Sequence, residues 1–480
     1  MLFSIAVTLL FLSIFASVVF TGFFRNIAKD RNILIDIPNK SRKFHFRPTP
    51  LIGGISIHAS MILSIVLMLF LVDYKYDFQL DGFALSGPSE EQKISEIGYS
   101  KQLSVLGDQG QNIENYRINL KTQDSRSLEL PSYEVRIGST EINQLKITQI
   151  EKNVFNVLMP NGVLKYYKAT ESGIVEIGLN GKTLSEPINV RNQSQNFYSI
   201  SSFTTAFIII AILLQGFTLF DDAYGMQPWK RLVAQISATL AVIFFGNIYI
   251  ESLQLSILGF NLNLGYWGIP FTVFAVVGII NAFNLIDGIN GLCAGFALIS
   301  MGALQIASGF SISNYSLVIA MGSIFGFLIY NLGFLGTKRR VFLGDNGSTF
   351  LGFLVAWTCV NYSSSAMGFI NPVTCLWIVA IPLLDCMGVM IGRAMQGIVP
   401  FSPGRDHIHH KLQAYTGSSF RTLIYLIVLG IFLAAVGIAI EKFTQSSEIS
   451  LLLFLGFSAC YYAAMNMLVR FTNKNSSPNV

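Results

Sequence analysis

Two amides and a carboxylate stand close together in the sequence, at Asn281, Asn284 and Asp287, directly after an apolar run. On a helix, residues three apart are offset by about 60°, so the three side chains would share one side. Gly288, the next residue, lets the backbone turn. Polar groups at the end of a membrane helix are costly unless they are paired or functional. The stretch is therefore a candidate site, and the alternative is a polar helix end that meets water.

Three more carboxylates lie at the edges of apolar runs. Asp221 and Asp222 are adjacent, and neighbouring carboxylates at a membrane boundary either hold one proton tightly or bind a cation between them. Asp345 follows Gly344 at the start of a predicted helix, whose N-terminus favours anions. A carboxylate beside a positive helix end suits a phosphate bridged by magnesium. A solvated acidic pair and a helix-capping aspartate are the respective alternatives.

Two clusters combine histidine with basic residues. The first contains Lys43 and His45, and binding of lipid headgroups would explain its basic residues. The second spans residues 400–411, and its groups that could contact phosphate are Arg405, His407, His409 and His410. Zinc is an alternative ligand, but no cysteine lies nearby, and cationic recognition of a diphosphate fits better. Oxygen ligands together with cations indicate magnesium and a phosphorylated substrate.

The elements that must position these clusters are membrane helices. The chain has 480 residues, of which 52% are hydrophobic and only 12% are charged. Soluble proteins average about a quarter charged residues. The net charge of +5 gives no indication of nucleic-acid binding, and we expect none. We therefore expect a polytopic protein embedded in the lipid bilayer.

Eleven apolar segments have roughly the length needed to cross a bilayer. They are residues 1–24, 51–72, 199–220, 232–250, 268–285, 289–307, 316–335, 348–360, 374–395, 423–440 and 451–469. Lysine and arginine gather in alternate loops, and all five clusters fall on that same side. By the positive-inside rule, the clusters face the cytoplasm and the N-terminus lies outside.

Residues 73–195 interrupt this pattern with a polar sequence. Alternating segments at residues 133–137 and 154–158 predict strands, and the turn signals Pro160-Asn-Gly162 and Asn180-Gly181 separate such segments. We predict an all-α polytopic membrane protein of about 11 transmembrane helices, with a small mainly-β extracytoplasmic domain inserted between helices 2 and 3. Its parts are residues 1–72 with helices 1–2, residues 73–195 as the inserted domain, and residues 196–480 with helices 3–11 and the cytoplasmic site loops.

At these motifs the chain resembles the polyprenyl-phosphate N-acetylhexosamine-1-phosphate transferases, of the glycosyltransferase 4 type. The family's motifs are matched, in order and spacing, by Asp221-Asp222, Asn281-Ala-Phe-Asn284-Leu-Ile-Asp287-Gly, Phe342-Leu-Gly-Asp345-Asn-Gly-Ser and His407-Ile-His409-His410. The histidine motif looks most like that of the bacterial WecA branch. The resemblance covers all the predicted spans and leaves the inserted domain outside.

The resemblance implies an enzyme of the bacterial cytoplasmic membrane that depends on Mg²⁺, with Mn²⁺ as a substitute. Undecaprenyl phosphate attacks the sugar-linked phosphate of a UDP-N-acetylhexosamine, and UMP leaves. The lipid-linked sugar diphosphate that forms starts synthesis of an envelope polysaccharide of the O-antigen type. N-acetylglucosamine is the expected sugar. Another UDP-N-acetylhexosamine and UDP-MurNAc-pentapeptide are the alternative donors.

The same resemblance implies roles for single residues. Asp345 and Asn284 are the implied metal ligands, and Asp287 supports the nucleotide and metal site. Asp221 and Asp222 would orient or deprotonate the lipid phosphate, or assist the metal. The implied substrate contacts are Asn281, Lys43, His45, Lys230, Arg405, His407, His409 and His410.

Two departures from the family and two other classes of function stay open. Asn290 stands where many WecA-like sequences have a second aspartate, and the inserted domain is not a standard feature of the family. A transporter would place the acids and histidines as a proton relay at mid-membrane depth, whereas these residues lie at span ends. A scaffold would recruit an envelope partner through the inserted domain. A homodimer is the candidate assembly.

Overall fold

The chain divides into two compact units. The first comprises Met1–Val72, Phe78–Leu85 and Ile200–Val480, and the second comprises Asp73–Asp77 and Ser86–Ser199. In the computed structural model, the described residues are 2–37, 47–71, 78–80, 83–85, 101–103, 116–118, 133–137, 140–151, 154–158, 164–170, 173–177, 202–257, 260–308, 315–364, 369–398, 404, 406–444 and 446–476.

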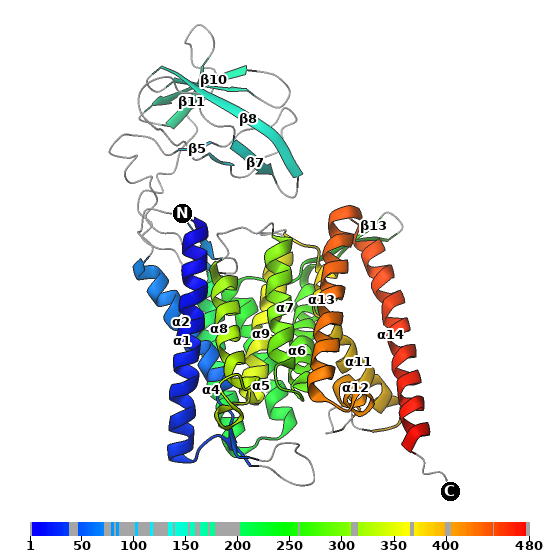
Figure 1. The fold of residues 1–480 in the computed structure, drawn as a ribbon. Helices are drawn as coiled ribbons and strands as arrows, with labels where there is room; N and C mark the ends of the chain where they lie inside the picture. Colours follow the sequence, from blue (N-terminus) through cyan, green and yellow to red (C-terminus); the bar gives the residue numbers. More distant parts are fainter. Residues whose placement is uncertain are drawn as a thin grey trace. The chain divides into compact units, whose positions relative to one another are not determined.

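The first unit is a bundle of helices (Figure 1). Their bounds are α1 (Leu2–Arg31), α2 (Gly53–Leu71), α4 (Ser202–Tyr224), α5 (Pro228–Gly246), α6 (Gly268–Ile286), α7 (Leu292–Ala307), α8 (Tyr315–Asn331), α9 (Gly344–Ser363), α10 (Pro372–Ile378), α11 (Ala380–Met395), α12 (Ile408–Thr416), α13 (Ser419–Thr444) and α14 (Ser447–Ser476). Within the described residues, five helices are long and apolar enough to cross a membrane, and the pair α10 and α11 makes a sixth candidate. The protein is therefore a polytopic membrane protein. Helices lie in all the segments that we predicted as spans, and the number that cross the membrane stays a prediction.

The ninth predicted segment, residues 374–395, is not one straight helix. It is broken at Val379 into α10 and α11, which meet at 84°. Pro382 follows the break, and a proline lacks the N–H that would bond the carbonyl four residues earlier, with which its ring also clashes. That carbonyl belongs to Ile378, the last residue of α10. The proline therefore explains why the helix cannot continue.

The helix α9 forms the centre of the bundle. All its residues except Asp345 are buried, as expected of a helix surrounded by other helices. It packs against α6, α4, α2 and α7. Gly352 permits the close approach of α6, because a side chain there would come within 2.8 Å of the Cα atom of Ile280. The first turn of α9 is thereby held beside the last turns of α6.

The helix α5 begins and ends at recognisable signals. Pro228 lies in its first turn, where the N–H that proline lacks would have no partner within the helix. Asn247 ends the helix in the left-handed conformation, with φ at 50°. Gly225, also with positive φ, makes the turn from α4. This short connection brings the first turns of α5 next to the last turn of α4.

Short strand pairs accompany the helices of the first unit. They are β1 (Ile35–Asp36) with β2 (Thr49–Pro50), β3 (Phe78–Leu80) with β4 (Phe83–Leu85), and β12 (Ser252–Ile257) with β13 (Phe260–Asn263). Leu51 forms a bridge with Phe342, and the N–H of Gly53 donates to the carbonyl of Phe342 at 3.0 Å. The start of α2 is therefore tied to the segment that leads into α9.

The described part of the second unit consists of strands. An antiparallel sheet has the order β11-β10-β9-β8-β7, and β5 pairs with β6. Their bounds are β5 (Lys101–Leu103), β6 (Tyr116–Ile118), β7 (Tyr133–Ile137), β8 (Thr140–Glu151), β9 (Val154–Leu158), β10 (Leu164–Thr170) and β11 (Gly173–Ile177). The segments predicted as strands at residues 133–137 and 154–158 are β7 and β9. Both predicted turns lie outside the described residues.

Candidate active site

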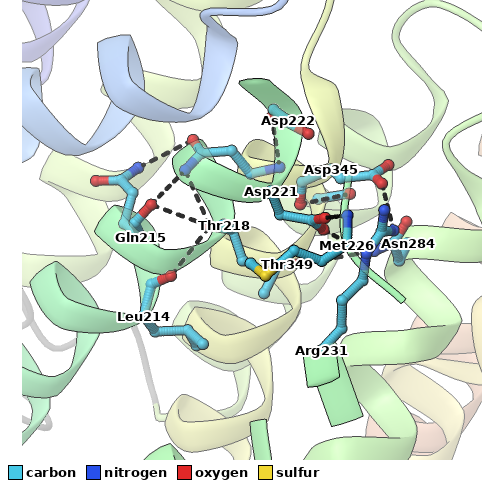
Figure 2. Close-up of polar contacts among 12 residues, drawn as sticks. Leu214, Gln215, Thr218, Asp221, Asp222, Met226, Arg231, Asn284, Asp345 and Thr349 are labelled. Atoms are coloured by element: carbon cyan, nitrogen blue, oxygen red, sulfur yellow. Dashed lines mark hydrogen bonds and ion pairs between the residues drawn. The ribbon is translucent and has the colours of Figure 1, made fainter. Parts of the chain in front are cut away.

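Carboxylates from α4 and α9 meet around one arginine of α5 (Figure 2). The Nε atom of Arg231 pairs with Oδ2 of Asp221, and its Nη1 atom lies 2.5 Å from Oδ2 of Asp345. Two acidic residues that are far apart in the sequence thus share one guanidinium. Arginine suits this position because its planar fork can serve two carboxylates at once.

Asp221 is the most deeply buried of these acids, with 2% of its surface exposed. Its Oδ1 atom accepts the N–H of Met226 at 2.6 Å, and its carbonyl accepts the N–H of Gly225 at 2.7 Å. The side chain therefore holds the turn between α4 and α5 and anchors Arg231. This position favours a structural role for Asp221 over contact with a substrate.

Asp222 faces the first turn of α9. Its Oδ2 atom accepts the backbone N–H of Asn346 at 3.1 Å. Gly344 has a φ of 78°, and a Cβ atom there would lie 3.1 Å from the same Oδ2. A side chain at Gly344 would thus strain the backbone and crowd Asp222.

Asp345 is the accessible member of the set. Its side chain is 41% exposed, while every other residue of α9 is buried. It lies in the first turn of that helix, where the partial positive charge of the helix N-terminus favours an anion. Of the acids around Arg231, Asp345 is therefore the one best placed to meet a ligand.

The amides predicted on one helix face come from the end of α6. Asn281 donates from Nδ2 to Oε1 of Gln235 in α5 at 2.8 Å, which ties α5 to α6. The Nδ2 atom of Asn284 lies 3.5 Å from Oγ1 of Thr349 in α9. The helix ends at Ile286, so Asp287 is its C-cap. The single helical face that we predicted therefore includes the two amides but stops short of Asp287.

Asp287 nevertheless belongs with the other acids. Burial, followed by the charges of Asp345 and Asp222, raises the pKa of the Asp287 carboxyl well above its usual range. Electrostatic interaction of this kind requires that the carboxylates lie near one another. Residues 222, 287 and 345 thus form one acidic site at the ends of α4, α6 and α9.

The histidine cluster is held in place by two acids. Asp385 of α11 accepts from Nδ1 of His407 at 2.9 Å and from the backbone N–H of Ile408 at 2.7 Å, which caps the start of α12. Arg393 donates to both oxygens of Asp406, at 2.8 and 2.6 Å. Although partial burial opposes it, this fork holds the pKa of the Asp406 carboxyl below its usual value. The sequence prediction included neither Asp385 nor Arg393.

His409 brings the histidine cluster to the acidic site. It is 1% exposed, and neither ring nitrogen has a hydrogen-bond partner among the described residues. Its Nε2 atom lies where a Cβ atom would be built on Gly288, the residue after Asp287. Burial, with the neighbouring His410 and His407, lowers the pKa of His409 to about 3. The ring is therefore a neutral hydrogen-bonding group at neutral pH.

Replacement of Gly288 by alanine tests this contact. The added methyl group would overlap the His409 ring, so we expect the histidine cluster to move away from Asp287 and turnover to fall by roughly 100-fold, the scale of a misplacement of about 1 Å. Turnover of the purified variant measures the effect. Gly278→Ala is the matched control, since a Cβ atom there meets no atom within 4 Å. Equal turnover of both variants would contradict the contact.

The remaining predicted residues divide into two groups. Lys230 is exposed and does not join the acidic site; its Nζ atom lies 5.9 Å from the ring centre of Trp229. Its neighbour Arg231, which the prediction omitted, makes the contacts instead. Lys43, His45 and Arg405 lie outside the described residues.

Comparisons with known proteins find relatives of the membrane unit. The model of a family described as glycosyl transferase family 4 matches residues 203–363, which include the four aspartates and both amides of the site. An undecaprenyl-phosphate alpha-N-acetylglucosaminyl 1-phosphate transferase of Escherichia coli O157:H7 is 36% identical over 225 residues, covering 46% of this chain and 61% of that protein. The enzyme of the same name from Haemophilus influenzae is 34% identical over 261 residues, covering 53% and 72%. The chain thus spans about three fifths of the E. coli relative and more of the second.

Proposed function

Because this chain belongs to glycosyl transferase family 4, among the polyprenyl-phosphate N-acetylhexosamine-1-phosphate transferases of the WecA type, we propose that it transfers N-acetylglucosamine 1-phosphate from UDP-N-acetylglucosamine to undecaprenyl phosphate. UMP is released, and the lipid-linked sugar diphosphate starts an envelope polysaccharide of the O-antigen type. One observation carries the proposal: Asp222, Asp287 and Asp345 gather at one site. The names of the relatives support the sugar and the acceptor.

The residues present suit Mg²⁺. Among the described residues, no three histidine, cysteine, aspartate or glutamate side chains gather as a complete metal cage. Mg²⁺ usually takes one or two carboxylates and completes its shell with water and substrate phosphate. Asp345 would hold it together with the amide oxygen of Asn284, and Mn²⁺ has similar ligand preferences. When bound, the ion neutralises the charge of the reacting phosphates.

The acids of the chain have separate tasks in the proposed reaction. An oxygen of the lipid phosphate forms a bond to the sugar-linked phosphorus, while the bond from that phosphorus to the oxygen of UMP breaks. Asp222 accepts the remaining proton of the lipid phosphate, or orients that phosphate if it is already fully ionised. Asp221 does not contact substrate and instead fixes Arg231. Asp287 supports the nucleotide side of the site.

The histidine cluster would hold the diphosphate of the donor. His409 lies against Gly288, and both of its ring nitrogens are free of partners among the described residues. Its neutral ring can donate one hydrogen bond to a phosphate oxygen. His407, fixed by Asp385, and His410 would add further contacts. Arg405, Lys43, His45 and Lys230 remain weaker proposed phosphate contacts.

Direct transfer is the decisive experiment for this function. Purified protein in detergent, with undecaprenyl phosphate and radiolabelled UDP-N-acetylglucosamine, should form a labelled lipid and an equal amount of UMP. Other UDP-N-acetylhexosamines and UDP-MurNAc-pentapeptide test the choice of donor. Absence of transfer with every donor would refute an enzymatic function and leave the transporter or the scaffold.

The predicted topology places all of this chemistry on the cytoplasmic face of the bacterial inner membrane. We propose eleven spans, with residues 73–195 outside and dispensable for transfer. Excision of that segment, with a short linker in its place, should leave turnover in detergent within about twofold of the intact protein, since no site residue lies there. A cysteine introduced at Asn161 should react with a reagent that cannot cross the membrane, added from outside. Labelling of this cysteine only from the cytoplasmic side would overturn the topology.

A further inference from the structure

A chain of buried polar side chains runs from α2 through α4 to α9. His58, Gln215 and Asn346 are 6%, 8% and 1% exposed, respectively. They are neutral or weakly basic groups inside a bundle whose other buried residues are mostly apolar. Buried polar groups of this kind are expensive unless each finds a partner. The proposed reaction assigns none of the three a task.

The hydrogen bonds of this chain have one direction. The amide of Asn346 donates from Nδ2 to the backbone carbonyl of Gln215 and to Oγ1 of Thr218, both at 3.0 Å. Its Oδ1 atom is therefore the acceptor that faces Nε2 of Gln215, at 3.4 Å. This orientation leaves Oε1 of Gln215 to accept from Nδ1 of His58. His58 is thus a donor at Nδ1, at the far end of the chain (Figure 2 shows Gln215 and Thr218).

The chain ends at a residue of the acidic site. The backbone N–H of Asn346 donates to Oδ2 of Asp222 at 3.1 Å. The side chain of the same residue is fixed by Gln215 and Thr218, which precede Asp222 on α4. Two contacts, one through the side chain and one through the backbone, therefore set the first turn of α9 against the last turn of α4. The position of Asp222 depends on both.

The helix α2 closes this arrangement from the other side. Gly54 lies against Asn346, because a Cβ atom there would overlap Oδ1 of Asn346. His58 is one helical turn further along and on the same face. The His58 ring also stacks on Phe350 of α9, with ring centres 4.5 Å apart. His58 thus touches the chain in two ways, by a hydrogen bond and by packing.

We propose that His58 is a positioning residue for the transfer reaction: through Gln215 and Asn346 it holds Asp222 in place. This inference rests on the proposed function only for the role of Asp222, since the coupling between His58 and α9 is a property of the fold. The inferred role lies in the hydrogen bond and not in the packing of the ring. Those two contributions can be separated by substitution.

Two variants of His58 exchange one contribution for the other. His58→Phe keeps a ring on Phe350 and loses the donor, whereas His58→Asn loses the ring and keeps an N–H near the place of Nδ1. We expect His58→Phe to lower kcat by roughly 10- to 100-fold, with KM for the donor sugar nucleotide within about twofold. His58→Asn should recover most of that loss. A kcat that is retained by His58→Phe and lost by His58→Asn would overturn the proposal in favour of packing.

A second measurement does not depend on activity. Hydrogen–deuterium exchange of a peptide covering residues 342–350 reports on the N–H of Asn346. In His58→Phe this peptide should exchange faster than in wild type and in His58→Asn, because the chain that holds it is cut. Unchanged exchange would refute the coupling, whatever reaction the protein catalyses. If the wild type transfers no sugar phosphate but the exchange rates differ as expected, the proposed function fails and the coupling stands.

If His58→Phe does not fold, Gln215→Met interrupts the same chain from α4 with a side chain of similar length. It should show the same fall in kcat and the same faster exchange at residues 342–350. Wild-type values for both in a folded Gln215→Met protein would also overturn the proposal.

Discussion

Asp345→Asn is expected to lower transfer by about 10³-fold, because loss of one metal-binding charge removes several kcal/mol of transition-state stabilisation, and ~4 kcal/mol corresponds to that factor. Asp345 has the exposed carboxylate at the head of the buried helix α9, next to a positive helix end. Asparagine keeps the shape and one acceptor oxygen but not the charge. Turnover under saturating substrates measures the effect.

The same substitution should leave the fold intact. Arg231 keeps its pair with the buried Asp221, and the other residues of α9 remain buried in the bundle. Equal elution in size-exclusion chromatography and a similar melting temperature would show this. Glu251→Gln is the control, since it also removes one negative charge from an exposed residue. Near-normal turnover by folded Asp345→Asn protein would remove Asp345 from the proposed site.

The residues that sequence reasoning found share one property: they interrupt apolar runs. Asp221, Asp222 and Asp345 stand at run ends, where a charge is conspicuous, and the structure places them around one arginine. A run end says little about which neighbour points inward. Adjacent helical residues differ by about 100° in direction, and the sequence gave no reason to prefer Arg231 over Lys230. Only the packing of α5 against α4 and α9 decides between them.

Other features depend on contacts between distant segments. Asp385 and Arg393 lie within a segment predicted as a single span, and their charges inside it were the one signal that could have singled them out. Their partners, His407 and Asp406, come from another loop. The approach of His409 to Gly288 needs the same tertiary fold. By contrast, the break at Val379 was accessible from the sequence, since Pro382 forbids a continuous helix there.

Arg231→Leu is expected to lower transfer by about 100-fold or more, through loss of a preorganised cation at the site. The guanidinium joins Asp221 to Asp345, so its removal leaves one buried and one exposed carboxylate without their shared partner. Asp345 is then free to move, and Asp222 and Asp287 add further repulsion. The buried Asp221 makes the loss a matter of stability as well, and a carboxylate stripped of its partner inside a protein costs roughly 3–5 kcal/mol. We therefore expect a lower melting temperature together with the lower turnover.

Three variants in one assay separate the role of Arg231 from a general effect of charge. Lys230→Leu removes the same charge one residue away, from an exposed side chain that does not touch the acids, and should retain turnover within about twofold. Arg231→Lys keeps the charge, but a single ammonium cannot reproduce the planar fork, so its turnover should fall between wild type and Arg231→Leu. If Lys230→Leu loses as much activity as Arg231→Leu, the effect belongs to the basic loop as a whole. The bridge between Asp221 and Asp345 would then have no separate part in the reaction.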